Sequence, residues 1–146
     1  MKLLLLFGVV LLSARVAAQS GHDVSDRNRF VGAWKLVSLE EPHADGQVHK
    51  VDCAGLFVFT SDGKASVQVM YRNAESGSAY AQSGYEASYG SYRIDDSSTF
   101  TFHIEGALVR TLIGKDLKRR YEIVGNRLTV KSIDPNEHWE VVWQRY

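Results

Sequence analysis

The sequence contains little of what usually marks a disulfide-bonded, metal-binding or catalytic protein. Its 146 residues include one cysteine, Cys53, so an internal disulfide bond cannot form. The histidines His22, His43, His49 and His138 do not have the spacing of metal ligands, and we assign neither a metal nor a cofactor. A glycine-rich phosphate loop, a Gly-x-Ser-x-Gly turn and a His-Glu-x-x-His motif are also missing. These absences argue against the common nucleotide-binding, hydrolase and metalloprotease classes.

An excess of charge of one sign is lacking as well. The chain has 17 basic and 17 acidic residues. The first 18 residues carry only Lys2 and Arg15, so the remainder has 15 basic against 17 acidic residues. Binding to nucleic acid or to an anionic membrane needs a concentrated basic surface, so we expect neither.

Long apolar runs are missing except at the N-terminus, where one has the pattern of a secretory signal. Lys2 provides a positive start, residues 3–12 are an apolar core, and residues 16–18 are small, as at a cleavage site. The run is too short for a membrane-spanning helix, which takes about 20 apolar residues. We therefore predict a cleaved signal peptide over residues 1–18, a flexible leader over residues 19–29, and a periplasmic or secreted protein without an integral membrane segment. We also expect a monomer.

The rest of the chain alternates between strand-like segments and turn signals, without a convincing helix. Asp62-Gly63 and Gly125-Asn126 indicate tight hairpins, because these residues accept the positive φ angles of such turns. Eight antiparallel strands joined in this way close into an up-and-down β-barrel, so we predict an all-β, eight-stranded barrel domain over residues 30–146. The expected strands span residues 30–39, 55–60, 65–71, 85–94, 99–105, 117–124, 127–132 and 138–145.

Two connections, residues 72–84 and 106–116, are long for so small a domain. The first is rich in Ser, Ala and Gly and has no periodicity. Long loops in compact domains often act as lids over a binding site. We expect residues 72–84 to be mobile and to border the open end of the barrel.

The first and last expected strands carry a matching pair of motifs. The chain reads Phe30-Val31-Gly32-Ala33-Trp34 at the start of the first strand and Trp143-Gln144-Arg145 at the end of the last. These segments resemble the Gly-x-Trp segment and the last-strand arginine of lipocalins. The resemblance implies that Arg145 packs across Trp34 and that Gly32, Trp34 and Arg145 close the base of the barrel.

More specifically, residues 30–145 resemble the bacterial and fungal lipocalin-like domain family. The resemblance covers nearly the whole chain beyond the leader, and it implies a calycin-type barrel that encloses a small molecule. The matching segments are Phe57-Val58-Phe59-Thr60-Ser61-Asp62-Gly63, Ser66-Val67-Gln68-Val69-Met70, Tyr89-Gly90-Ser91-Tyr92, His103-Ile104-Glu105, Gly114 and Arg119.

Alternation along each strand decides which side chains line the interior. One assignment points a set of polar side chains inward. A slip by one residue instead fills the interior with Phe100, Phe102 and Ile104 and leaves His103 and Arg119 on the surface. The residues alone leave both open, and the resemblance favours the first. The candidate ligand-binding residues are then Phe57, Phe59, Gln68, Met70, Tyr92, His103, Glu105 and Arg119, with Tyr121, Trp139 and Trp143 on the same face.

Polar groups inside a barrel need partners, because an unpaired buried charge is unfavourable. We expect Arg119 to pair with Glu105, and His103 to share a proton with Gln68 or Tyr92. Such a cluster is able to hold a carbonyl or carboxylate group of a ligand, or to carry out acid–base chemistry, since histidine titrates near neutral pH. A purely structural network is the simpler alternative.

Three functions follow from this reading. The leading one is an exported binding protein for a small, largely apolar molecule with one polar group. The second is an isomerase or cyclase that uses the barrel as a reaction chamber, which the resemblance permits without requiring. A protein-binding or inhibitory module acting through the two long connections has the least support.

Overall fold

The chain is an eight-stranded antiparallel β-barrel with one extra short strand. The structure, a computed structural model, describes residues 25–42, 45–74 and 78–146. The predicted signal peptide and residues 19–24 of the predicted leader lie outside the described residues. The elements are β1 (Gly32–Pro42), β2 (Val48–Lys50), β3 (Cys53–Phe59), β4 (Lys64–Tyr71), β5 (Tyr85–Ile94), β6 (Thr99–Ala107), η1 (Arg110–Leu112), β7 (Asp116–Val124), β8 (Arg127–Ser132) and β9 (Glu140–Arg145).

Each strand from β3 to β9 pairs with its neighbour in sequence, and β1 pairs with both β3 and β9. The β1–β9 ladder, in which Trp34 lies opposite Arg145, closes the barrel. Strand β2 lies outside the barrel and pairs only with the far end of β1, in a region where the sequence predicted a loop. The predicted eight-stranded up-and-down barrel is confirmed.

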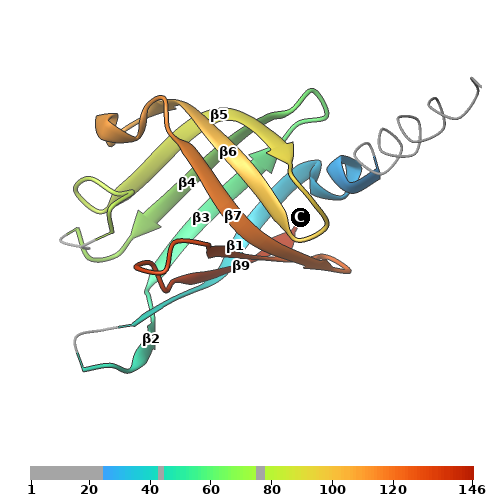
Figure 1. Ribbon diagram of the computed structural model, residues 1–146. Coiled ribbons are helices and arrows are strands. Elements are labelled where there is room, and N and C mark those ends of the chain that lie inside the picture. Colours follow the sequence, from blue (N-terminus) through green and yellow to red (C-terminus); the bar gives the residue numbers. More distant parts are fainter. Residues whose placement is uncertain (1–24, 43–44, 75–77) are drawn as a thin grey trace, which may run out of the picture.

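The short and the long connections between strands lie at opposite ends of the barrel (Figure 1). Tight hairpins join β3 to β4, β5 to β6 and β7 to β8 at one end, where the residue 25–30 helix also lies. The longer connections around β2, between β4 and β5, through η1, and between β8 and β9 all lie at the opposite end. We call these the closed end and the open end.

The closed end is sealed by the three residues that the sequence predicted. The guanidinium of Arg145 lies 4.2 Å from the centre of the Trp34 ring and donates hydrogen bonds to the carbonyl oxygens of Val31 and Arg29. Gly32 adopts φ +133°, and a Cβ there would lie 2.7 Å from Nη1 of Arg145, so a larger residue would displace the arginine. The barrel-closure prediction for Gly32, Trp34 and Arg145 is confirmed.

Residues 25–30 are helical, whereas the sequence predicted a flexible leader as far as residue 29 and a strand that begins at Phe30. The helix ends with Phe30, which is fully buried and contacts Phe59, Phe100 and Tyr121 at ring-centre distances of 4.7–5.3 Å. Its carbonyl oxygen accepts a hydrogen bond from Nε1 of Trp34 at 2.7 Å. A short polar segment thus becomes ordered because one aromatic side chain at its end enters the core.

The interior is more apolar than the sequence predicted, because the expected orientation of β4 and β6 is wrong. Residues directly opposite each other in an antiparallel pair share one face. Phe57 faces inward and lies opposite Val67, so Val67 is buried and Gln68 points outward. Tyr92 faces inward and lies opposite Phe102, so His103 points outward. Ser66, Met70 and Glu105 are likewise on the outside, whereas Phe100, Phe102 and Ile104 are buried.

Candidate functional site

A cavity occupies the half of the barrel nearer the open end. Aromatic side chains, which include Phe57, Phe102 and Trp143, and aliphatic side chains make up most of its wall. The unoccupied volume is about 710 Å³ when the opening to solvent is included.

Arg119 is the cation of this cavity. It is the fourth residue of β7 and lies opposite Phe100, whose inward direction it shares. Its side chain is only 11% exposed. The guanidinium lies 5.2 Å from the ring centre of Tyr80 and 4.9 Å from that of Trp139, so two aromatic side chains contact it. Such contacts stabilise a cation that burial has removed from water.

Tyr80 connects Arg119 to a carboxylate at the open end. Nη2 of Arg119 donates a hydrogen bond to the Tyr80 hydroxyl at 2.7 Å, and that hydroxyl donates to Oε1 of Glu137. Oε2 of Glu137 lies 3.6 Å from Nη1 of Arg119. Burial is the largest cause that raises the pKa of Tyr80 to about 12, so its hydroxyl stays protonated at neutral pH. Tyr80 belongs to the 72–84 connection, which therefore borders the open end as the sequence predicted.

Glu86 is a carboxyl group inside the same cavity. It lies on β5 opposite Val69, and it shares its inward face with Ser88 and Tyr92. Removal from water raises its pKa to about 7, with Glu41 adding to the rise and the charge of Arg119 opposing it. Among the described residues, no hydrogen bond is made by its carboxyl group. Glu86 is thus able to change its charge near neutral pH.

Two of the eight predicted ligand-binding residues line the cavity. These are Phe57 and Arg119. Phe59 and Tyr92 are buried as predicted but fill the closed end below the cavity, where the Tyr92 hydroxyl donates to the carbonyl oxygen of Thr60 at 3.0 Å. Tyr121 does the same with the carbonyl oxygen of Asp96 at 3.2 Å.

The other four predicted residues, Gln68, Met70, His103 and Glu105, lie on the outer face of the barrel. Met70 is 55% exposed. His103 is bonded through Nδ1 to Asp116 at 2.7 Å, and not to Gln68 or Tyr92. Glu105 pairs with Lys64 at 2.7 Å, and not with Arg119. The predicted His103 network and the predicted Arg119–Glu105 pair are therefore both wrong.

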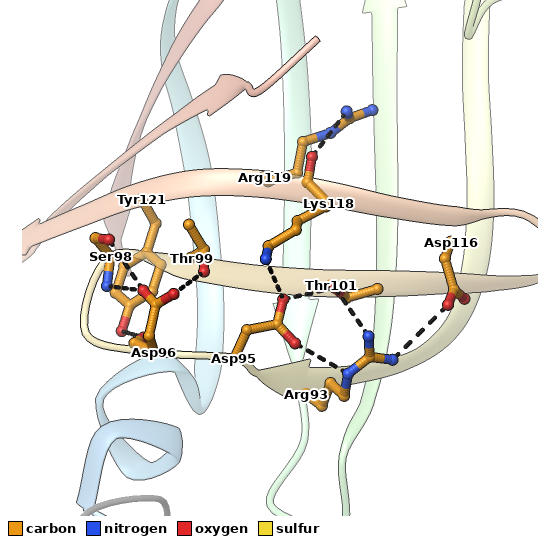
Figure 2. Close-up of polar contacts among 10 residues, drawn as sticks. All are labelled: Arg93, Asp95, Asp96, Ser98, Thr99, Thr101, Asp116, Lys118, Arg119 and Tyr121. Atoms are coloured by element: carbon orange, nitrogen blue, oxygen red, sulfur yellow. Dashed lines mark hydrogen bonds and ion pairs between the residues drawn. The ribbon is translucent and has the colours of Figure 1, made fainter.

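Figure 2 shows how neighbouring residues of β7 leave the strand in opposite directions. Lys118 points to the outer face, where its Nζ lies 4.0 Å from Asp95, whereas Arg119 points away from this group. Asp95 also accepts hydrogen bonds from Arg93 and Thr101. This outer network is structural, since its members are bonded to one another on the far side of the sheet from the cavity.

The sequence did not predict three residues of the site, which are Glu86, Tyr80 and Glu137. Glu86 was within reach, because it has the same parity as Tyr92 on one uninterrupted strand. Tyr80 and Glu137 lie in connections, where alternation carries no information about direction. Trp139, which was assigned the inward face as a packing residue, lines the cavity.

Within the part of the chain that the structure describes, no three His, Cys, Asp or Glu residues are grouped so that they could hold a metal ion. No helix among residues 25–42, 45–74 and 78–146 has the length and apolar character needed to cross a membrane.

A comparison of the sequence with known families agrees with the order of the motifs, the closed barrel and the sealed base. The family described as a lipocalin-like domain matches residues 31–146. The chain belongs to the lipocalin-like domain family. Curated proteins searched with the same sequence gave no match.

Solved structures of lipocalin-like and related barrels are similar to this chain. An uncharacterized protein from Bacteroides eggerthii has a TM-score of 0.50 and 20% identity, over 80% of this chain and 99% of its own. A lipocalin-like protein from Bacteroides uniformis has a TM-score of 0.50 and 15% identity, over 81% and 99%. A Schistosoma mansoni fatty acid binding protein, solved with arachidonic acid, has a TM-score of 0.45 and 12% identity, over 83% and 98%. At these identities the first two similarities show the fold of this lipocalin-like chain.

Proposed function

We propose that this lipocalin-like protein binds a small, largely apolar molecule with one polar group inside its barrel. The observation that carries the proposal is the cavity itself, which combines apolar walls with a few buried polar side chains at one end. That combination is typical of small-molecule sites, where apolar surface provides affinity and few polar groups fix orientation.

The size of the cavity limits the size of the ligand. The unoccupied volume is about 710 Å³ even when the opening to solvent is included. A slender chain or a single flat ring fits such a space better than a bulky polycyclic molecule. The ligand enters from the open end, because Arg145, Trp34 and Phe30 fill the closed end.

Native mass spectrometry of protein purified from its own host tests the proposal, with a co-purified apolar molecule as the expected result. A binding titration with straight-chain alcohols, read by the fluorescence of Trp139 and Trp143 in the cavity wall, gives a second measurement. Ser88→Leu fills the cavity and should weaken binding about tenfold or more, whereas Gln68→Leu on the outer face of β4 should not. Equal affinity in both variants, at unchanged melting temperature, would place binding elsewhere.

A second function, an isomerase or cyclase, is favoured by one observation. Glu86 has a pKa raised to about 7 and lines the same cavity as the cation Arg119. A carboxyl group with this pKa both accepts and donates protons at neutral pH, as general acid–base catalysis requires. Conversion of the co-purified molecule by wild-type protein, lost in Glu86→Gln, would establish it. An unchanged molecule after long incubation would exclude this chemistry for that ligand.

We further propose that the protein is exported after cleavage near residue 18. The support is the order of a positive start, an apolar core and small residues over residues 1–18. N-terminal sequencing of protein recovered from the host should begin close to residue 19. A chain that retains Met1 would contradict the proposal.

A further inference from the structure

We propose that Glu86 makes the cavity select a ligand whose polar group is a protonated amine rather than a carboxylate. This inference rests on the proposed function, and names the chemical class of ligand for the same cavity. It has three grounds, which are the sum of charge in the cavity, the existing contacts of Arg119 and the position of Glu86.

Glu86 and Arg119 line the cavity, and Glu137 lies 3.6 Å from Arg119 at the open end. With both of these carboxyl groups ionised, the three side chains together carry one more negative than positive charge. Interactions between charges strengthen where water is excluded, so this small imbalance acts strongly on a bound ion. A carboxylate placed in the bore would add a further negative charge to it, whereas an ammonium group would neutralise it.

Arg119, which a carboxylate ligand would need, already has its partners. Its guanidinium contacts the rings of Tyr80 and Trp139, donates to the Tyr80 hydroxyl at 2.7 Å and to the Ser132 hydroxyl at 3.4 Å, and lies 3.6 Å from Glu137. A ligand carboxylate would have to displace Glu137 or share the cation with it. Breaking one buried charge pair to make another gains little, because the displaced carboxylate is left without its partner.

Glu86, in contrast, has no hydrogen-bond partner among the described residues, although it lies within the cavity. The titratable groups on the neighbouring elements are Glu41 on β1, Cys53 on β3, Tyr71 on β4, Tyr80 in the connection and Arg119 on β7. Of these, only Arg119 carries a positive charge. A second cation beside Glu86 would stabilise its ionised form and supply the hydrogen-bond donors that it lacks.

The raised pKa of Glu86 gives the proposal a second readout. Its pKa is about 7 in the empty barrel, so the group is partly protonated at neutral pH. An alkylamine stays protonated until about pH 10. Amine affinity should therefore increase as pH rises from 5.5 to 8.5 and Glu86 ionises, whereas carboxylate affinity should decrease over the same range.

Decylamine, 1-decanol and decanoate test the selection, because they share one apolar chain and differ only in the polar group. We expect the wild-type protein at pH 7.5 to bind decylamine most tightly and decanoate least tightly. Glu86→Gln should weaken decylamine binding about tenfold or more, affect 1-decanol much less, and remove the increase of amine affinity with pH. Glu105→Gln is the matched control, since Glu105 is on the outer face and paired with Lys64.

Each outcome separates this inference from the proposed function. Tighter binding of decanoate than of decylamine, or an amine preference that survives in Glu86→Gln, would overturn the selection by Glu86 while leaving the apolar site intact. Failure of all three compounds to bind the wild-type protein would overturn the proposed function and this inference together. Melting temperatures of both variants show whether the barrel remains folded.

Discussion

The closed and open ends of the barrel bury polar groups in different ways. At the closed end, the polar groups of the buried aromatic residues donate hydrogen bonds to backbone carbonyl oxygens. Trp34 donates to the carbonyl of Phe30, Tyr92 to that of Thr60 and Tyr121 to that of Asp96. At the open end, the polar groups meet one another, as in the chain of contacts from Arg119 through Tyr80 to Glu137.

This difference separates stability from recognition. Hydrogen bonds to backbone carbonyls of the barrel hold one geometry, because those carbonyls move only with the sheet. Side chains bonded to one another can exchange partners when a ligand arrives. The buried Nε1 atom of Trp143, in the cavity wall, has no hydrogen-bond partner among the described residues. We infer that the closed end determines whether the barrel folds, and that the open end determines what it binds.

The largest expected effect tests the role of the closed end. Phe30→Ala removes a fully buried ring that contacts three other aromatic side chains at 4.7–5.3 Å. The loss of packing should lower the free energy of unfolding by about 3–5 kcal/mol, measured by urea denaturation. The helix at residues 25–30 should become susceptible to proteolysis in the same variant. A loss below about 1 kcal/mol would show that the helix merely rests on the barrel.

A smaller effect is expected from the arginine that covers the base. Arg145→Ala removes the stacking on Trp34 and two hydrogen bonds to backbone carbonyls, and should lower stability by about 1–3 kcal/mol. Arg145→Lys keeps the charge but loses the planar group, so thermal denaturation should place it between the wild type and Arg145→Ala. Ligand affinity should not change in either variant. An unchanged melting temperature would contradict the closure by Arg145.

At the open end, stability should depend on pH through Glu86. Its pKa is raised from 4.5 to about 7 in the folded protein, so between these values the folded state binds more protons than the unfolded state. The contribution of Glu86 is therefore fully present below about pH 4.5 and is lost as pH rises through about 7. Relative to Glu86→Gln, the wild type should lose about 1–3 kcal/mol over this range in denaturation curves measured at several pH values. Parallel pH profiles would contradict the burial of this carboxyl group.

The smallest effect is expected on the outer face. Glu105→Gln breaks a solvent-exposed pair with Lys64 and should leave the free energy of unfolding nearly unchanged, because water screens the two charges. His103→Ala and Gln68→Ala should leave ligand affinity unchanged, because both side chains are outside the barrel. A loss of binding in either variant would move the site away from the cavity.

Most of the fold was predictable because its signals are local. The Asp62-Gly63 turn, with Gly63 at φ +86°, and the alternation around it identify a hairpin without reference to the rest of the chain. The seal formed by Gly32, Trp34 and Arg145 was predictable from its resemblance to lipocalins. The helix at residues 25–30 was not, because its order depends on Phe30 entering a core assembled from distant strands.

The site was less predictable because it depends on register. The length of the hairpin between β3 and β4 places Phe59 opposite Ala65, and therefore Phe57 opposite Val67. If Phe57 faces inward, Val67 does too and Gln68 faces outward. The prediction of an inward Gln68 is inconsistent with this register. The pairing of Tyr92 with Phe102 excludes an inward His103 in the same way. Tyr80 and Glu137, which contact Arg119, lie in two connections between strands. In such segments neither alternation nor turn type indicates which side chain points into the barrel.

The position of the last residue has a consequence for handling the molecule. Its backbone N–H bonds to the carbonyl oxygen of Ala33, so the C-terminal end lies at the sealed base, near the helix at residues 25–30 (Figure 1). A fused reporter, an affinity tag or a sensor surface joined to residue 146 is therefore adjacent to the base. The opposite rim then faces the bulk solution, so protein immobilised through its C-terminal end keeps free passage for solutes.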